Sequence, residues 1–216
     1  MKTIVYVDGF NLYYRALRKS NHKWLDLHAL CEAALPSFCN ITKINYYTAL
    51  VSGVRNPTAP RDQNSYMRAL RTLPNLQIHL GQFQVTNKWM YLVQPVELRP
   101  VSTTDAIPNP DFARVVKREE KGSDVNLGVH LVRDAFTGSF EHAAVITDDT
   151  DLIEPVRIAV HEARLPITLL TPVDRPAKGL EVLATHVRNL RPYLGVSQFP
   201  NPVAGPKGPI HKPLGW

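Results

Sequence analysis

The feature that most constrains the fold of this chain is a repeated alternation of short, β-branched apolar runs with segments that carry apolar residues at helical spacing. The first run, TIVYV at 3–7, is almost entirely apolar, which is typical of a strand buried on both faces of a sheet. Strands are predicted at 3–7, 41–51, 76–83, 142–147, 166–172 and 187–190, and helices at 10–19, 26–35, 65–73, 123–136, 151–163 and 177–186. Asp26 and Ser123 are expected to cap two of these helices. This order predicts an α/β fold with a mainly parallel, doubly wound sheet.

Two stretches depart from the alternation. Residues 84–113 are expected to form an irregular insertion, with a hairpin arm at 88–93 and a Pro-rich surface loop after it. A short edge strand is predicted at 114–120. From residue 196 to 216 the chain has five prolines and no periodicity, so an extended tail is expected, laid over the body and held there by Trp216. Residues 1–195 are expected to form one domain.

Composition narrows the class of protein. The chain is 44% hydrophobic and 20% charged, which is ordinary for a globular protein, and no stretch approaches the roughly 18 apolar residues of a membrane span. The N-terminus is expected to be a strand rather than a signal peptide. Two cysteines without a CxxC pair suit a reducing cytoplasm. The formal net charge of +6 favours polyanionic partners such as nucleic acid.

Acidic residues gather where the predicted strands end. They are Asp8 after the first strand, Asp124 in the first turn of a later helix, and Asp148, Asp149 and Asp151 after the strand AAVIT. In an open parallel sheet ligands bind outside the carboxyl ends of the strands, so these carboxylates are expected to meet at one edge. Crowded carboxylates repel each other unless they share a cation or bind protons, and all-oxygen sites prefer Mg²⁺ or Mn²⁺. The pattern therefore favours a divalent-metal site of the kind that serves phosphate chemistry.

Each of these residues also has an ordinary structural interpretation. Asp8 could cap the helix that starts at Gly9, and Asp124 could interact with a helix dipole. Their joint placement is what favours a site. Asn11 and Thr147 are candidates to orient groups around the metal, and Lys121 is a candidate to steady a substrate phosphate.

Basic and aromatic residues are interleaved near the first helix and before the Asp124 helix. The candidates for nucleic-acid binding are Arg15, Arg18, Lys19, Lys117 and Arg118, with Tyr13, Tyr14, Trp24 and Trp89 as aromatic neighbours. Such a mixture predicts a groove for single-stranded RNA with stacking platforms. The alternative is that the tyrosines belong to the core and the basic residues to a solvated face.

Four segments of the sequence resemble a known protein family. The segments YVDGFNLYY (6–14), EEKGSDVNLGVHLVRDAF (119–136), AAVITDDTDLIEPVRIA (143–159) and the tail at 197–216 are similar to NYN-domain proteins, relatives of the PIN nucleases, in a bacterial branch once catalogued as a domain of unknown function. The resemblance spans essentially the whole chain. It implies a PIN-like three-layer α/β/α fold and a metal-dependent ribonuclease site. The broader family also resembles ring hydroxylases of pyridine catabolism.

The resemblance assigns roles residue by residue. The family's first acidic residue falls on Asp8, with its companion asparagine on Asn11. The lysine-glycine-x-aspartate element falls on Lys121, Gly122 and Asp124. The paired aspartates fall on Asp149 and Asp151, with Thr147 in the small hydroxyl position. Two positions depart from the pattern: Asp148 stands where many relatives have glycine or asparagine, and His130 where many have aspartate, which leaves a second metal open.

The sequence therefore predicts a cytoplasmic, metal-dependent endoribonuclease. Asp8, Asp149 and Asp151 would hold Mg²⁺ or Mn²⁺, and Asp124 would complete the site or position the attacking water. A haloacid-dehalogenase phosphatase is disfavoured because its general acid would fall on Phe10. Two alternatives remain open: an RNA- or partner-binding protein that does not cleave, and a hydroxylase of a small pyridine-type acid. A homodimer is one expected assembly.

Overall fold

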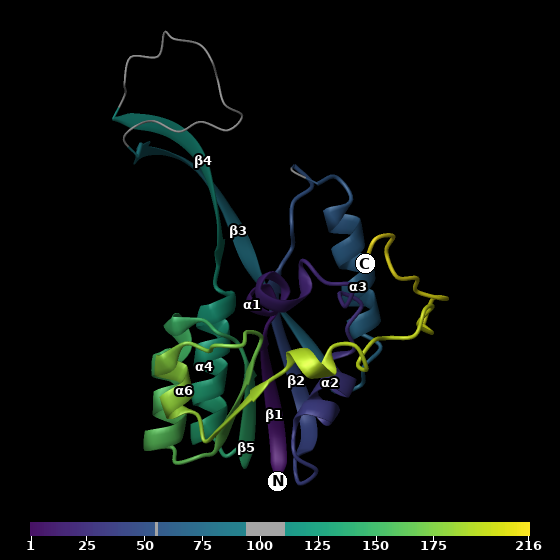
Figure 1. Ribbon diagram of the computed structural model, residues 1–216, viewed down its shortest axis with the longest axis vertical. Coiled ribbons are helices and arrows are strands. Elements are labelled where there is room, and N and C mark those ends of the chain that lie inside the picture. The colour runs from purple at the N-terminus through teal and green to yellow at the C-terminus, as the bar shows by residue number, and fades with distance from the viewer. Residues whose placement is uncertain (55, 94–110) are drawn as a thin grey trace.

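The computed structural model describes residues 1–54, 56–93 and 111–216. Within them, seven strands form one sheet in the order β4-β3-β2-β1-β5-β6-β7 (Figure 1). The strands are β1 Lys2–Asp8, β2 Asn40–Ala49, β3 Leu76–Tyr91, β4 Phe112–Lys121, β5 His142–Ile146, β6 Ile167–Thr171 and β7 His186–Asn189. All neighbours pair in parallel except β3 and β4, which are antiparallel. The predicted α/β class with a mainly parallel sheet is confirmed.

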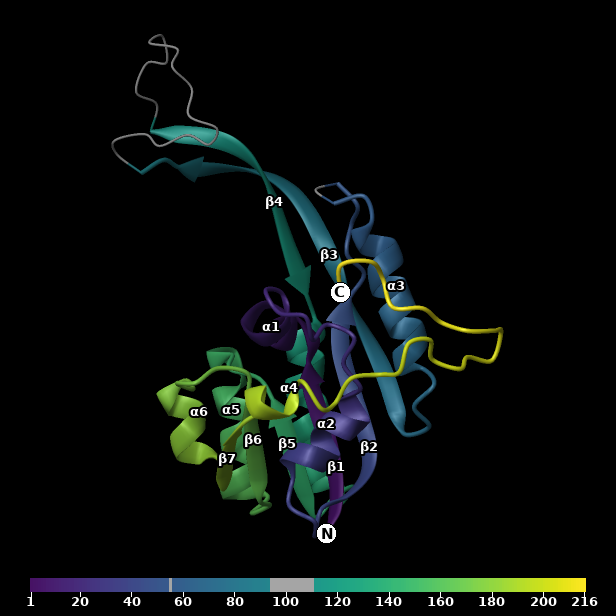
Figure 2. The ribbon, with the colours of Figure 1, turned by 45° about the vertical axis from the view of Figure 1, so that its right-hand side comes forward.

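Helices cover both faces of the sheet. They are α1 Gly9–Leu12, α2 Leu27–Ala34, α3 Ala59–Leu70, α4 Ser123–Phe136, α5 Ile153–Arg157 and α6 Lys178–Leu183. Short π-helical turns at Tyr13–Leu17 and Ile158–Glu162 continue α1 and α5. Helices α4, α5 and α6 lie on one side of the sheet, and α2 and α3 on the other (Figures 1 and 2). The arrangement is compatible with a three-layer α/β/α fold. Among the described residues, no helix is long and apolar enough to cross a membrane.

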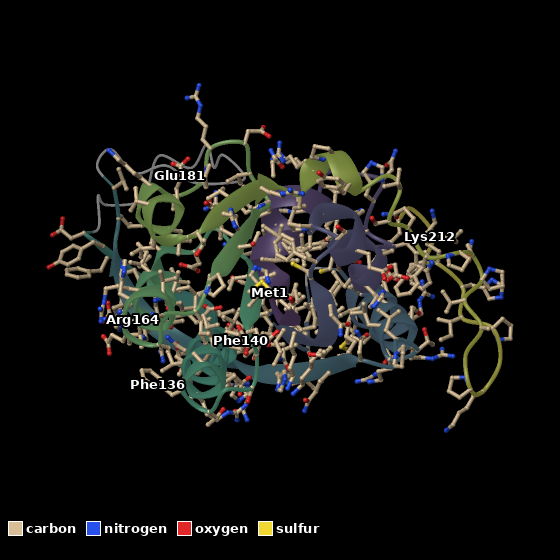
Figure 3. The ribbon with its side chains drawn as sticks, turned by 90° about the horizontal axis from the view of Figure 1, so that it is seen from below. Met1, Phe136, Phe140, Arg164, Glu181 and Lys212 are labelled. Carbon is tan, nitrogen blue, oxygen red and sulfur yellow. The ribbon has the colours of Figure 1, made fainter. Side chains whose placement is uncertain are left out.

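The first strand shows why this sequence builds two cores. Side chains alternate between the faces of a strand, and β1 is apolar from Ile4 to Val7. Val5 and Val7 join the cluster on the α2 side, while Ile4 and Tyr6 join the cluster on the α4 side. Side chains fill the space on both faces of the sheet when it is viewed from below (Figure 3). A strand with apolar residues on only one face would leave one of these layers without support.

Two helix starts differ from the sequence-based expectation. Helix α3 begins at Ala59 rather than at residue 65, because Pro60 lies in its first turn, where a missing N–H costs nothing. The cap of α4 is Gly122 rather than Ser123, since Gly122 adopts a left-handed φ of 95° that favours glycine. The Ser123 hydroxyl instead donates a hydrogen bond of 2.6 Å to Glu120. The predicted cap of α2 is confirmed: Asp26 accepts from the backbone N–H groups of the first turn.

The predicted irregular insertion at 84–113 is largely strand where it is described. The first part of β3 pairs with β2, and residues 82–91 then pair antiparallel with β4. This second part forms a two-stranded ribbon, here called the arm (residues 82–91 and 112–121). The arm projects away from the body of the protein (Figures 1 and 2). The Pro-rich stretch at 94–110 lies outside the described residues.

The C-terminal tail lies on the body beside α3 (Figure 2). Phe199, Val203 and Ile210 are buried, so the tail completes the core on the α2 side. The indole N–H of Trp24 donates to the carbonyl of Pro200 at 3.0 Å. Trp216 packs against Tyr66 with ring centroids 5.7 Å apart, at the place where the sequence suggested an anchor.

Candidate functional site

The candidate site lies at the carboxyl ends of β1 and β5, which are adjacent in the sheet. Val7 is level with Ile146, so the next residues, Asp8 and Thr147, face each other at the edge. The Thr147 hydroxyl donates to Asp8 Oδ2 at 3.0 Å, and the backbone N–H of Asn11 donates to Asp8 Oδ1 at 2.9 Å. Asp8 therefore caps α1, as its ordinary interpretation expects, and is also a buried carboxyl group with only 2% of its surface exposed.

A cavity of about 370 Å³ opens beside Asp8. Its lining combines residues from α1, the arm, α4 and the loop after β5, namely Asp8, Phe10, Asn11, Tyr14, Arg15, Phe83, Glu120, Asp124 and Asp149. Three of the predicted aspartates thus share one cavity. Glu120 adds a fourth carboxyl group that sequence reasoning had not assigned to the site.

The electrostatics of the cavity centre on Asp8. Burial raises the pKa of Asp8 to about 7, and the nearby negative charges of Asp124 and Asp149 add to the effect. The hydrogen bonds from Asn11 and Thr147 act in the opposite direction. Burial also raises the pKa of Asp124, and the negative charges of Asp149 and Glu120 add to this effect. With a pKa near 7, Asp8 can hold a proton near neutral pH, which lowers the negative charge of the cavity.

Two of the predicted aspartates lie elsewhere. Asp148 turns toward α6, where its carboxylate accepts a 2.7 Å hydrogen bond from the backbone N–H of Ala177. Its own backbone N–H donates to the side chain of Asn11 at 3.0 Å, so Asn11 ties the loop after β5 to α1. Asp151 is exposed and borders a neighbouring groove instead of the cavity. Asp148 and Asn11 therefore have structural contacts that account for their polarity.

Aromatic side chains form one wall of the cavity. The rings of Phe10 and Phe83 meet edge to face, with their centroids 5.7 Å apart. The rings of Phe10 and Tyr14 are stacked, with their centroids 6.3 Å apart. The Arg18 guanidinium lies 5.6 Å from the centroid of the Tyr14 ring. Sequence reasoning missed Phe83, because only the pairing of β3 with its neighbours brings this strand residue beside α1.

The predicted nucleic-acid-binding residues divide between two elements. Arg15 lines the cavity, while Arg18 and Lys19 are exposed in the turns after α1. On β4, Lys117 forms an ion pair with Glu119, and Arg118 donates to the Ser52 hydroxyl at 2.7 Å. Lys121 also pairs with Glu119, at 3.7 Å, and borders the neighbouring groove. RNA as a partner stays a prediction.

The comparisons with known proteins do not point to a nuclease. No family model matches this sequence, so the resemblance to NYN-domain proteins also stays a prediction. The chain is similar to 6-hydroxy-3-succinoylpyridine 3-monooxygenase HspA of Pseudomonas putida, with 29% identity over 244 aligned positions, which cover 100% of this chain and 75% of the relative.

A solved structure supports the fold alone. It is a protein of unknown function from Vibrio parahaemolyticus with a TM-score of 0.53 and 16% sequence identity, and the match covers 86% of this chain and 90% of that one. At this level of identity the likeness carries no information on activity.

The predicted metal-dependent endoribonuclease is contradicted by these findings. The relative is named as a monooxygenase, which is an oxidoreductase and not a hydrolase of phosphodiester bonds. The predicted Mg²⁺ or Mn²⁺ cofactor is contradicted as well, because no group of three or more His, Cys, Asp or Glu residues in the described ranges could hold a metal ion. Asp8, Asp124 and Asp149 do converge on one cavity, whereas Asp148 turns to Ala177 and Asp151 lines the neighbouring groove together with Asp124.

Proposed function

We propose that this chain is a hydroxylase that adds one oxygen atom to a small N-heteroaromatic acid. The observation that carries the proposal is its similarity, along its whole length, to a 6-hydroxy-3-succinoylpyridine 3-monooxygenase. The sequence analysis left the same function open as an alternative, because the broader NYN-domain family resembles ring hydroxylases of pyridine catabolism. The geometry of the cavity agrees with a substrate of this class.

The size and lining of the cavity suit a planar ring. A volume of about 370 Å³ lies at the lower end of the roughly 300–1,000 Å³ that small-molecule sites occupy. Phe10, Tyr14 and Phe83 supply aromatic surfaces on one wall, and aromatic rings pack well in offset or edge-to-face contacts. A pyridine ring with one short acidic side chain matches this combination of volume and lining.

Asp8 is suited to remove a proton from a ring hydroxyl. In the substrate of the named relative, the hydroxyl at ring position 6 is para to position 3, where that enzyme acts. Loss of the hydroxyl proton raises the electron density at the para carbon and makes this carbon a better acceptor of an electrophilic oxygen. A general base is most effective when its pKa lies near the working pH, and the pKa of Asp8 is about 7.

Arg15 is the cationic residue that lines the cavity with the carboxyl groups. A substrate carboxylate is repelled by Asp124, Asp149 and Glu120 and attracted by the Arg15 guanidinium, which offers a bidentate match to a carboxylate. The acidic end of the substrate is therefore oriented toward Arg15, and the ring hydroxyl toward Asp8.

Hydroxylation of this kind places one atom of O₂ on the ring and reduces the other to water with two electrons from a donor. Where the ring carbon carries an acyl group, as position 3 does in the relative's substrate, the bond from that carbon to the acyl carbon breaks, and water takes up the acyl group as a carboxylic acid. A redox cofactor with a pyrophosphate group usually places that group at the helix that follows the first strand. Here the Asp8 carboxyl group caps this helix, and Asp124 and Asp149 lie beside it. These residues do not fit a pyrophosphate, so binding and proton transfer are the only roles assigned to them.

The test is oxygen incorporation. Purified protein is incubated with 6-hydroxy-3-succinoylpyridine and related pyridine acids under ¹⁸O₂, with a reduced nicotinamide and added flavin as electron source, and products are analysed by mass spectrometry. One ¹⁸O atom per product is expected. Asp8→Asn should lose at least about 100-fold in kcat, as loss of a general base does. Arg15→Gln should mainly raise KM.

Glu181→Gln is the matched control, because Glu181 is an exposed carboxyl group on α6 (Figure 3). It should leave the rate within about twofold of the wild type, since surface changes away from a site have little effect. Absence of ¹⁸O in every product across the panel would overturn the proposed function. Equal activity of Asp8→Asn and the wild type would remove Asp8 from the reaction.

A further inference from the structure

The arm has one apolar face and one polar face. Antiparallel pairing places Phe83, Val85, Asn87, Trp89 and Tyr91 of β3 on the same side as Phe112, Arg114, Val116, Arg118 and Glu120 of β4. The opposite side carries Gln82, Gln84, Thr86, Lys88, Lys117, Glu119 and Lys121, with Met90, Ala113 and Val115. The first side is therefore an apolar surface interrupted by arginines.

This apolar face is strongly exposed. Tyr91 is 79% exposed, Trp89 67% and Val116 63%, on an arm that projects away from the described body of the protein (Figure 2). A two-stranded ribbon is marginally stable by itself in water, and an exposed apolar ribbon readily pairs with another surface. The arm thus has the properties of a segment that is covered by a partner.

A second exposed apolar surface lies between α4 and α5. A groove of about 750 Å³ is lined by Val125, Val129, Val132, Leu152, Pro155 and Ile158. Val125 is 67% exposed and Val129 58%, on a helix whose opposite side is buried in the core. This stripe continues along α4 to Phe136, which is also exposed (Figure 3).

The charges of the two surfaces are complementary. The groove is bordered by the carboxyl groups of Glu120, Asp124, Asp151 and Glu154, of which Glu154 is paired with Arg157. Its two cations are already paired within the chain, Lys121 with Glu119 and Arg133 with Asp134. The apolar face of the arm carries arginines instead, and Arg114 is exposed near its outer end.

We infer that the arm of one copy of this chain lies in the α4–α5 groove of a second copy, and that the two copies exchange arms around a twofold axis. The arm starts beside its own groove and points away from the body, so the occupant of each groove comes from another molecule (Figure 2). Reciprocal exchange leaves neither an arm nor a groove uncovered, as a closed twofold dimer requires.

The buried area is sufficient for a stable dimer. Five apolar side chains on the arm face lie beyond the cavity residue Phe83 and expose roughly 600 Å², if each aromatic side chain presents about 150–250 Å² when fully exposed. They are Val85, Trp89, Tyr91, Phe112 and Val116. Two such contacts, counted on both partners, exceed the roughly 1,200 Å² at which specific interfaces begin. The aromatic residues Trp89 and Tyr91 are the expected centres of binding energy.

Sedimentation velocity over about 1–100 µM protein tests the arm and the groove separately. The wild type is expected to be a dimer, and Trp89→Glu in the arm and Val129→Glu in the groove are each expected to raise the dimer Kd by at least about 100-fold. Met90→Glu, on the other face of the arm, and Val182→Glu, on exposed α6, are the matched controls and should dimerise as the wild type does. All four positions are exposed, and circular dichroism verifies that each variant is folded.

A mixture of Val129→Glu and Trp89→Glu tests whether the arm of one chain lies in the groove of the other. The Val129→Glu chain has an intact arm and the Trp89→Glu chain an intact groove, so their mixture keeps one of the two contacts and should form heterodimers more weakly than the wild type. A wild type that stays monomeric at 100 µM, or a mixture that forms no heterodimer, overturns the inference. Binding of single-stranded RNA by a monomer, lost in Trp89→Glu, would also overturn it and assign the arm to nucleic acid.

Discussion

Replacing Asp8 by asparagine is expected to stabilise the protein at alkaline pH. Burial raises the pKa of Asp8 to about 7 in the folded protein, whereas the usual value of 3.8 applies to the unfolded chain. Between these values the folded state binds a proton that the unfolded state has released. The free energy of unfolding of the wild type must therefore fall as the pH rises through this window.

The structure sets the size of the effect. The difference between 3.8 and about 7 corresponds to roughly 4 kcal/mol, and Asp8 is only 2% exposed, so solvent screens little of it. An amide keeps the hydrogen bond from Asn11, but it leaves the Thr147 hydroxyl proton without its acceptor, at a cost of about 1 kcal/mol. Asp8→Asn should therefore match the wild type near pH 4.5 and exceed it by about 3 kcal/mol at pH 8.5.

Urea unfolding followed by tryptophan fluorescence at intervals between about pH 4.5 and 8.5 measures this difference. Thr147→Val serves as a companion variant: loss of the hydroxyl donor should raise the pKa of Asp8 further and extend the fall in stability to higher pH. If the difference between Asp8→Asn and the wild type stays constant within about 0.5 kcal/mol over this range, Asp8 titrates as an ordinary carboxyl group. The argument for its role as a base near neutral pH would then be refuted.

Removal of the tail from residue 197 onward is expected to cost at least about 4 kcal/mol of unfolding free energy in urea titrations, since three buried side chains are lost; an unchanged midpoint would show that the tail does not complete the core. Gly128→Ala should cost about 1–3 kcal/mol, because the new Cβ would lie 2.8 Å from the Pro155 ring, and a thermal melt equal to that of the wild type would contradict this close approach of α4 and α5. Burial lowers the pKa of His142 from 6.5 to about 4, so the folded state binds fewer protons and stability falls as the pH drops through this range. His142→Gln should remove roughly 3 kcal/mol of that acid sensitivity, and an unaltered pH profile would argue against it.

Local sequence patterns predicted most of the helices and strands. They failed where the pairing of one strand with another determines where a strand ends. The strand 142–147 and the helix 123–136 were recognisable because apolar residues recur at a fixed period, which the packing on either face then uses. The strand predicted at 76–83 runs on to Tyr91, because its second part is stabilised by β4 rather than by burial of an apolar run. The start of α3 was placed too late because Pro60 was interpreted as part of a loop.

The candidate site was predictable in part. Asp8 and Asp149 follow strands, and the rule that ligands bind at the carboxyl ends of parallel strands brings them to one edge. Asp148 and Asp151 have the same local signal, yet the first turns to Ala177 and the second is exposed. Which of three neighbouring aspartates faces a cavity depends on the geometry of a single turn, which residue type does not specify.

By itself the sequence determined an alternating α/β order with carboxyl groups at strand ends, since periodicity and residue type are local properties. Tertiary structure alone decided that β1 and β5 are neighbours, with Asp8 facing Thr147 across 139 positions of sequence. It also decided the burial of Asp8, which raises the pKa of this carboxyl group to about 7. The same aspartates would suit a metal ion if they were arranged around it, and their arrangement depends on long-range packing that no local pattern contains.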